Sequence, residues 1–345
     1  MNKYILFRNK TGKVSFLFEK KTIVVIIILA CLLSVLLIAG LSIGSTMLNP
    51  LVVIKHLLNL GNGEHAFIIE TLRLPRIILA LMAGGALGVS GLIMQGIIRN
   101  PLGSPDIIGI TGGASFTAVV FITYFADTLG IKWLPLVTIA GAAVISILVY
   151  LLSWKKGVTP MRLVLIGIGM SAAMSALTTM VLVTGNEYTT SQAYLWLTGS
   201  VYGATWGNVY SMLPWLLIFI PLAVFYSKTV NVQELGDEVA VGLGVKVQLH
   251  RFSLLFISVA LAGSTVAFAG GIRFVGLIAP HISRKLVGRS FGNLVPVSAL
   301  VGGLIVSLAD IFVRTAFLPL DLPAGIFVSG IGAPFFIYLL YREHY

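Results

Sequence analysis

The amino-acid sequence predicts an all-α integral membrane fold with about ten transmembrane helices. Of its 345 residues, 57% are hydrophobic and 10% are charged, whereas about a quarter of the residues in a soluble globular protein are charged. Long apolar runs repeat along almost the whole chain and leave no polar block large enough to fold separately. The basic residues lie between these runs, mostly on one side of the predicted membrane. These three observations exclude a soluble fold.

The apolar runs have the length that a bilayer requires, because about 20 helical residues cross a hydrocarbon core of about 30 Å. Charged residues, prolines and glycines separate ten runs, which cover residues 22–44, 72–98, 106–126, 133–153, 160–184, 207–227, 251–271, 274–288, 294–313 and 322–340. The run at 274–288 is short for a crossing, so we expect neighbouring protein to shield it. Residues 22–345 are therefore expected to form a single transmembrane domain.

A basic segment, residues 1–21, precedes the first apolar run. It resembles the start of a signal peptide, but the run after it is about 22 residues long and lacks a small-x-small cleavage site, which favours an uncleaved anchor. With this segment in the cytoplasm, ten crossings put 17 of the 23 Lys and Arg residues inside and 6 outside, and the outer six are Lys55, Arg73, Arg76, Lys132, Arg273 and Arg314. This asymmetry agrees with the positive-inside rule, so both termini are expected in the cytoplasm.

Several common kinds of site are missing from the sequence. A net charge of +11 indicates nucleic-acid binding only when a basic face lies on a soluble module. The single cysteine, Cys31, excludes a disulfide framework. The sequence has no GxxxxGK(S/T) phosphate-binding loop, and its five histidines do not have metal-ligand spacing. We therefore expect this chain to be a transporter subunit rather than an enzyme, with no metal site and no cofactor.

Asp310 is the main acidic residue within an apolar run. Arg314 lies four residues on, so we expect an ion pair within one helix. An intramembrane carboxylate that binds a proton or a cation would instead indicate ion-coupled transport, and a secondary transporter therefore stays open as an alternative. Asp106 follows Pro105 at the start of a predicted helix, where a carboxylate is electrostatically favourable.

The polar segment between the sixth and seventh runs, around residues 231–245, is predicted to be one short amphipathic helix. Leu235, Val239 and Leu243 lie at positions i, i+4 and i+8 and form an apolar stripe. The other faces and the C-terminal end carry Glu234, Asp237, Glu238 and Gly244. A helix that lies on the membrane surface normally has Lys and Arg on its polar face, so this acidic helix is expected to dock into a cytoplasmic partner.

Three arginines lie at the outer ends of the predicted helices. Arg73 and Arg76 flank Pro75 at the start of the second run, and Arg314 ends the ninth. Their position opposes the positive-inside bias, and a guanidinium group has a planar fork of donors that matches carboxylates. We expect these residues to bind acidic groups of a partner or an anionic solute, whereas snorkelling to the interface is the alternative.

Small residues recur inside the apolar runs. Gly84 and Gly88 have GxxxG spacing, with Gly91 three residues further on, and such residues allow close helix packing in a membrane. A shift of the chain by 179 residues aligns Gly91 with Gly270 and Pro101 with Pro280. In the predicted topology the two copies would run in opposite directions, as the repeats of many transporters do. Chance matching of glycine-rich segments is the alternative.

Several sequence blocks, in the same order, resemble permeases of the FecCD type, which belong to ABC importers for iron-siderophores, haem and cobalamin. The blocks are Arg73-Leu-Pro-Arg76, Gly84-Gly-Ala-Leu-Gly88 continuing to Gln95, Asn100-Pro-Leu, Leu243-Gly-Val245, Phe274-Val-Gly-Leu-Ile-Ala-Pro-His281, and Leu322-Pro-Ala-Gly-Ile with Gly332-Ala-Pro-Phe335. The resemblance covers nearly all of the chain beyond residue 20. It implies a type II importer permease with ten helices per subunit.

The resemblance also implies the partners of the chain. It implies two permease subunits around a central path, two cytoplasmic ATPases and an extracytoplasmic binding protein. The helix around 231–245 would then be the coupling element, and Arg73, Arg76 and Arg314 would contact glutamates of the binding protein. Residues 186–206 resemble a short outer gate helix, with a surface hairpin as the alternative. Residues with gating or packing roles would include Trp196, Gly199, Pro280 and Pro323.

The predicted function is therefore transport without chemistry on the substrate. ATP binding in the partner subunits would open and close a mostly apolar, neutral path for an iron(III)-siderophore. The long basic N-terminal segment resembles that of hydroxamate-siderophore permeases, and this resemblance implies a hydroxamate siderophore. The same importer carrying haem or cobalamin is a further alternative.

Overall fold

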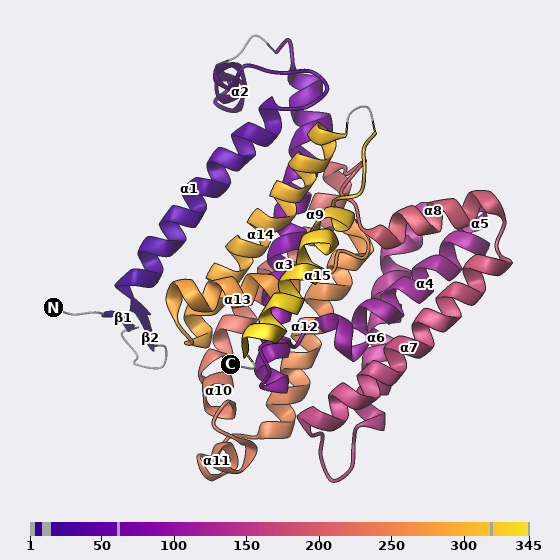
Figure 1. Ribbon diagram of the computed structural model, residues 1–345. Helices are drawn as coiled ribbons and strands as arrows, with labels where there is room; N and C mark the ends of the chain where they lie inside the picture. The colour runs from indigo at the N-terminus through magenta and orange to yellow at the C-terminus, as the bar shows by residue number, and fades with distance from the viewer. Residues whose placement is uncertain (1–3, 9–14, 61–62, 318–319, 344–345) are drawn as a thin grey trace.

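The computed structural model describes residues 4–8, 15–60, 63–317 and 320–343 (Figure 1). An antiparallel hairpin of β1 (Tyr4–Arg8) and β2 (Ser15–Glu19) leads into the helices. These are α1 (Lys20–Ser42), α2 (Pro50–Leu57), η1 (Phe67–Arg73), α3 (Leu74–Ile98), η2 (Pro105–Ile108), α4 (Ile110–Tyr124), α5 (Ala126–Leu129), η3 (Ile131–Trp133), α6 (Leu134–Leu152), α7 (Pro160–Thr184), α8 (Glu187–Thr198), α9 (Trp206–Phe225), α10 (Ser227–Gln233), α11 (Asp237–Gly242), α12 (Val247–Ala269), α13 (Val275–Val287), α14 (Phe291–Ala316) and α15 (Ala324–Glu343).

Each of the ten predicted apolar runs coincides with one helix, which confirms the all-α membrane fold. Within the described part of the chain, eight helices are long and apolar enough to cross a membrane. The other two are α4, with 15 residues, and α13, with 13 residues. The run at 274–288, which corresponds to α13, was expected to be short.

The basic N-terminal segment contains a feature that the sequence analysis did not predict. Residues Tyr4–Arg8 pair with Ser15–Glu19, and α1 begins directly after the second strand. Lys3, Lys10 and Lys13 of this segment lie outside the described residues. The hairpin and the end of α15 lie in the lower half of Figure 1, toward the end of the bundle that carries α10 and α11.

Helix α3 is the centre of the bundle, and nearly all of its side chains are buried. It packs against α14, α12, α13 and α9. Two contacts are between backbones: a Cβ atom added at Gly84 would lie 2.1 Å from the Gly302 oxygen, and one added at Gly91 would lie 1.8 Å from the Gly276 oxygen. Since no side chain fits there, these glycines permit an approach that any other residue would prevent.

The two halves of the chain meet at α3 and α12, which pack against each other. Helix α3 also packs on α14, and α12 also packs on α6. The two central helices are antiparallel, because Asp237 bonds both to Arg99 at the end of α3 and to Arg251 near the start of α12. The residue register of 179 does not describe this arrangement, since Gly91 lies inside α3 whereas Gly270 follows the end of α12.

Candidate functional site

Arg76, Asp310 and Asp321 form an ion cluster at the end of the bundle where α3 begins, here called the outer cluster because the sequence predicts that this end faces outward. The Arg76 Nη2 atom lies 2.8 Å from Asp310 Oδ1, and its Nη1 atom lies 2.6 Å from Asp321 Oδ2. Further bonds from Nε to Asp310 and from Nη2 to Asp321 make both pairs bidentate. The Tyr202 ring lies 5.6 Å from the guanidinium carbon, a distance suited to a cation–π contact.

The outer cluster corrects the predicted partner of Asp310. The expected bond to Arg314 within one helix does not form; Arg314 donates instead to the Gly40 carbonyl oxygen at the end of α1. Arg76, from α3, takes the carboxylate because its planar fork meets both oxygens at once. A pair one helical turn apart gives a weaker interaction.

Arg73 caps the same end of α1. Its Nη1 atom donates to the Leu41 oxygen at 2.6 Å, and its Nη2 atom donates to the Thr46 oxygen at 2.5 Å. The last carbonyls of a helix have no partner within the helix and favour a nearby cation. The three outer arginines are between 6% and 9% exposed. Their donors therefore face this chain, and the side chains do not snorkel to the surface.

Arg99, Asp237 and Arg251 form a second ion cluster at the opposite end of α3, here called the inner cluster. Asp237 accepts from Arg99 and, at 2.9 Å, from Arg251 Nη2. Arg251, whose side chain is 2% exposed, also donates to the Val158 carbonyl oxygen between α6 and α7. One carboxylate therefore connects α11 with α3, α12 and the loop that precedes α7.

The segment around 231–245 is not the single helix that the sequence analysis predicted. It forms α10 and α11, separated at Glu234–Gly236, where Gly236 has a φ of +116°. Glycine adopts this conformation readily, which explains the break. Leu235 and Leu243 are 65% and 64% exposed, and Val239 is 48% exposed.

The acidic residues of this segment point in different directions. Asp237 turns inward to the inner cluster, whereas Glu234 and Glu238 are exposed beside the apolar residues. Partial burial raises the pKa of Glu234, and Arg284 and Arg289 oppose this shift. Gly244, which follows α11, has a φ of +82°. The surface available to a partner is therefore apolar with an acidic edge.

Within residues 186–206, Glu187–Thr198 form a helix, and a short loop then leads to α9 at Trp206. This helix, α8, contains Trp196 and ends at Gly199, which has a φ of +77°. The Gly325 amide at the start of α15 donates to the Gly199 oxygen at 3.0 Å, and the Ser200 amide donates to the Ala269 oxygen at 2.8 Å. The end of α8 is thus tied to both α12 and α15.

Two prolines with predicted gating or packing roles lie nearby, one beside the end of α8 and one in the short helix α13. Pro323 immediately precedes α15, and Pro280 is inside α13. A proline inside a helix removes one backbone hydrogen bond and favours a bend. Both residues therefore mark positions where the helical pattern is interrupted.

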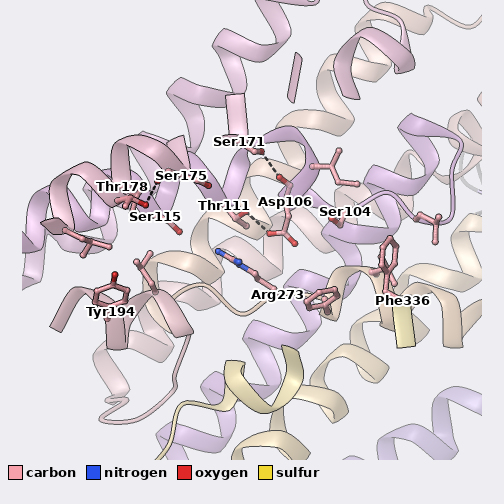
Figure 2. A pocket seen from close by; sticks show the side chains of 18 residues that line it. Ser104, Asp106, Thr111, Ser115, Ser171, Ser175, Thr178, Tyr194, Arg273 and Phe336 are labelled. Carbon is pink, nitrogen blue, oxygen red and sulfur yellow. Dashed lines mark hydrogen bonds between the residues drawn. The ribbon is translucent and has the colours of Figure 1, made fainter. Parts of the chain in front are cut away.

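A cavity of about 520 Å³ lies between η2, the first half of α4, the second half of α7, and α8 (Figure 2). Seven serines and threonines line its wall: Ser104, Thr111, Ser115, Ser171, Ser175, Thr178 and Thr179. The Asp106 carboxylate accepts from Thr111 Oγ1 at 2.6 Å, and the Ser171 hydroxyl donates to the Asp106 backbone oxygen at 2.9 Å. Arg273 and Tyr194 also line the cavity.

The expected path is mostly apolar and neutral; this wall exposes more apolar than polar area and carries one residue of each charge, but it also has a row of hydroxyl groups that was not expected. The predicted topology placed Arg273 in an outer segment. Asp106 was expected only to be an acid at the start of a helix. Arg273 and Asp106 share the wall of this cavity because of the turn that follows α12, where Gly270 has a φ of +68° and the chain returns toward η2. No spacing in the sequence indicates that these two residues line one cavity, although Arg273 itself is visible as an isolated cation between apolar runs.

Within the described ranges, no group of three or more His, Cys, Asp or Glu residues is arranged to hold a metal ion. The chemistry available at the cavity is therefore hydrogen bonding and charge recognition. Arginine donates and does not accept, so it can recognise an anion but cannot act as a metal ligand.

Residues 32–342 match the model of the FecCD transport family. The achromobactin transport system permease protein CbrC of Dickeya dadantii (strain 3937) is 50% identical over 309 residues, which are 90% of this chain and 88% of that protein. The siderophore transport system permease protein YfhA of Bacillus subtilis (strain 168) is 45% identical over 329 residues, 94% of this chain and 96% of that protein. A solved metal-chelate type ABC transporter in an inward-facing conformation superposes with a TM-score of 0.81 at 31% identity, covering 93% of this chain and 99% of that chain.

Proposed function

Because the chain belongs to the FecCD transport family, we propose that it is the membrane permease of an ATP-driven importer that moves an iron(III)-siderophore across the cytoplasmic membrane. The observation that carries this proposal is the match over nearly the full length with permeases named for achromobactin and siderophore transport. The hydroxamate type of siderophore stays a prediction, for which the sequence itself offers only the basic N-terminal segment.

The orientation follows from charge and from the position of the chain ends. The basic segment 1–21 lies before α1 and forms the cytoplasmic end of a single permease domain, 22–345. The hairpin and the end of α15 lie toward the same end of the bundle as α10 and α11 (Figure 1). The excess of Lys and Arg in the inner segments supports a cytoplasmic location for that end.

We assign ATP hydrolysis to a separate cytoplasmic subunit, which docks on the surface made by α11 and its flanks. Leu235, Val239 and Leu243 supply exposed apolar area, and Glu238 supplies an acidic edge. An exposed apolar patch with a charged rim is typical of a protein interface. The inner cluster directly behind this surface gives a route from the partner to α3 and α12.

A second permease subunit would complete the path. Helix α7 is largely exposed, with only a narrow stripe of buried residues, and its other faces are apolar or small. Part of the cavity wall comes from α7, so a partner there would close the open side of the cavity. A homodimer and a heterodimer both fit this arrangement.

The outer end would receive a substrate-binding protein. Arg73, Arg76 and Arg314 are bonded within this chain. A carboxylate of the binding protein therefore has to displace an internal partner or bind the surface that these residues support. Asp321 is the more accessible partner, with a side chain 28% exposed against 4% for Asp310, and is the first that an incoming carboxylate would replace.

Ion-coupled secondary transport, the alternative from the sequence, loses its main support in this arrangement. Asp310 is held by a bidentate bond to Arg76. A carboxylate that is permanently paired has no free site for a transported proton or cation.

The test is uptake of iron-55 complexes by cells that express this chain with its partner ATPase, at a fixed membrane potential. We expect uptake to stop when the ATPase is inactivated by substitution of its phosphate-binding lysine. Uptake that persisted without ATPase activity and fell with an ionophore would contradict the proposal and indicate a secondary transporter.

A further inference from the structure

We propose that Arg273 recognises the negative charge of an anionic ferric chelate as the chelate passes through the cavity. The inference rests on the proposed function and adds a cargo class to it. The permease itself would then contribute part of the cargo selectivity, through one side chain in the cavity wall.

The cavity has the size and position of a cargo site. Its volume of about 520 Å³ lies in the range of small-molecule pockets, about 300–1,000 Å³. Ser171 lies near the middle of α7, and Tyr194 belongs to α8, the expected outer gate helix. The cavity therefore extends from the middle of the bundle toward its outer half and lies beside the largely exposed α7.

Arg273 is an exposed residue, and it differs from three other arginines of the bundle in its partners. Arg76, Arg99 and Arg251 each bind a carboxylate. Among the described residues, Arg273 takes part in no ion pair within 4.0 Å and in no recorded hydrogen bond, and its side chain is exposed to the cavity. A guanidinium group on a cavity wall that has no ion-pair partner keeps its donors available for an anion.

Asp106, the one acid among the described residues of the wall, is close enough to attract Arg273 electrostatically but forms no ion pair with it within 4.0 Å. The Asp106 carboxylate is held by the Thr111 hydroxyl at 2.6 Å, and the Ser171 hydroxyl fixes the backbone of the same residue. Figure 2 shows Arg273 reaching into the cavity beside Thr111 and Asp106. An anionic group of the cargo would therefore bind at Arg273 and be repelled from Asp106, which sets its orientation.

The chemistry of the wall matches a chelate whose metal is already enclosed. A guanidinium group binds a carboxylate or another planar anionic oxygen pair with two parallel hydrogen bonds. The serine and threonine hydroxyls can donate to, or accept from, neutral polar groups of the ligand. Neutral chelates would use only the hydroxyls, so the charge of Arg273 separates the two classes.

The experiment uses the complete importer, with its ATPase and binding protein, in cells and in proteoliposomes. Iron-55 ferric citrate and ferric enterobactin serve as anionic probes, and ferrichrome serves as the neutral probe. Wild type is expected to transport at least one anionic probe. Arg273→Gln should reduce that uptake at least tenfold and leave any ferrichrome uptake within about twofold, and Arg273→Lys should restore part of the loss.

Lys132→Gln is the matched control, because it removes a positive charge from η3, outside the cavity. It should leave uptake of every probe at the wild-type rate. Co-purification of the ATPase and its basal ATP hydrolysis report on folding and assembly of each variant. A variant that fails either check is replaced by Arg273→Met, for which the same selective loss is expected.

The outcomes separate this inference from the proposed function. ATPase-dependent uptake of only the neutral probe by wild type would overturn the role of Arg273. Anionic uptake that Arg273→Gln leaves unchanged, or that falls equally with ferrichrome uptake, would overturn it as well. Wild type that transports none of the iron probes would instead contradict the proposed function.

Discussion

The two ion clusters at the ends of α3 have opposite compositions. In the outer cluster one arginine lies between two carboxylates, and in the inner cluster one carboxylate lies between two arginines. Each cluster has one well-buried partner, Asp310 or Arg251, and one more exposed partner, Asp321 or Arg99. The shared residue differs, because the Arg76 side chain is 10% exposed whereas that of Asp237 is 34% exposed. We infer that the outer cluster stabilises the bundle through a buried residue, whereas the inner cluster can exchange partners near a docking surface.

The largest effect is expected from Arg76→Met, which breaks the outer cluster. Removal of one partner leaves the buried Asp310 charge without compensation, at a cost of about 3–5 kcal/mol in unfolding free energy. The measurement is thermal unfolding of the purified permease in detergent. Asp321→Asn is the matched control and should cost less, since that side chain is more exposed. If Arg76→Met unfolded at the same temperature as wild type, the outer cluster would not stabilise the bundle.

Asp237→Asn tests the inner cluster and should have an intermediate effect. Arg251 is almost completely buried and would lose its charged partner, and hydrogen bonds to charged groups contribute about 1.5–3 kcal/mol. We also expect ATP hydrolysis to continue with reduced uptake, because the link from α11 to α3 and α12 is weakened. The measurement is the ratio of uptake to ATP hydrolysis in proteoliposomes. An unchanged ratio together with unchanged stability would remove the coupling role of Asp237.

Arg99→Gln sharpens the comparison within the inner cluster. Arg99 is the partly exposed partner of Asp237, and such pairs contribute about 0.2–1 kcal/mol. The loss of unfolding free energy should shrink further at high salt, since ions screen exposed charges. Urea unfolding at low and high ionic strength checks this result. A large, salt-independent loss would mean that both clusters are equally sequestered.

The smallest effect on stability is expected from Glu238→Lys, on the exposed edge of α11. Surface substitutions of this kind usually change the unfolding free energy by less than about 0.5 kcal/mol. The reversed charge should nevertheless weaken ATPase docking and lower uptake. Co-purification of the ATPase measures docking directly, with Lys132→Gln as the control. Normal docking and uptake would argue against the acidic edge as part of the interface.

The fold was predictable from the sequence, whereas the pairing of its charged residues was not. Apolar runs of bilayer length permit little except helices, and each predicted run coincides with one. Asp310 and Arg76 are 234 positions apart, so a local pair with Arg314 was the only partner that spacing could indicate. The break at Gly236 had a visible signal, the glycine itself, but the regular spacing of Leu235, Val239 and Leu243 favoured a continuous helix.

The cavity shows the same limit in another form. Counting residues between apolar runs assigned Arg273 to an outer segment, because such counting assumes that every run crosses the membrane directly. The short α13 and the turn before it bring Arg273 back toward η2. The identity of the residue was therefore informative, but its depth depended on how the chain folds back.

Helix α3 acts mechanically as a rod. Its 25 residues correspond to about 37 Å at 1.5 Å per residue, and no proline interrupts its interior. Arg76 lies at one end of this rod and Arg99 at the other, so neither cluster can shift along the axis without the other. An axial displacement of α3 at the end that carries the inner cluster would move the end that carries the outer cluster in the same direction and by nearly the same distance. Gating at the two ends would then be a single movement of this helix.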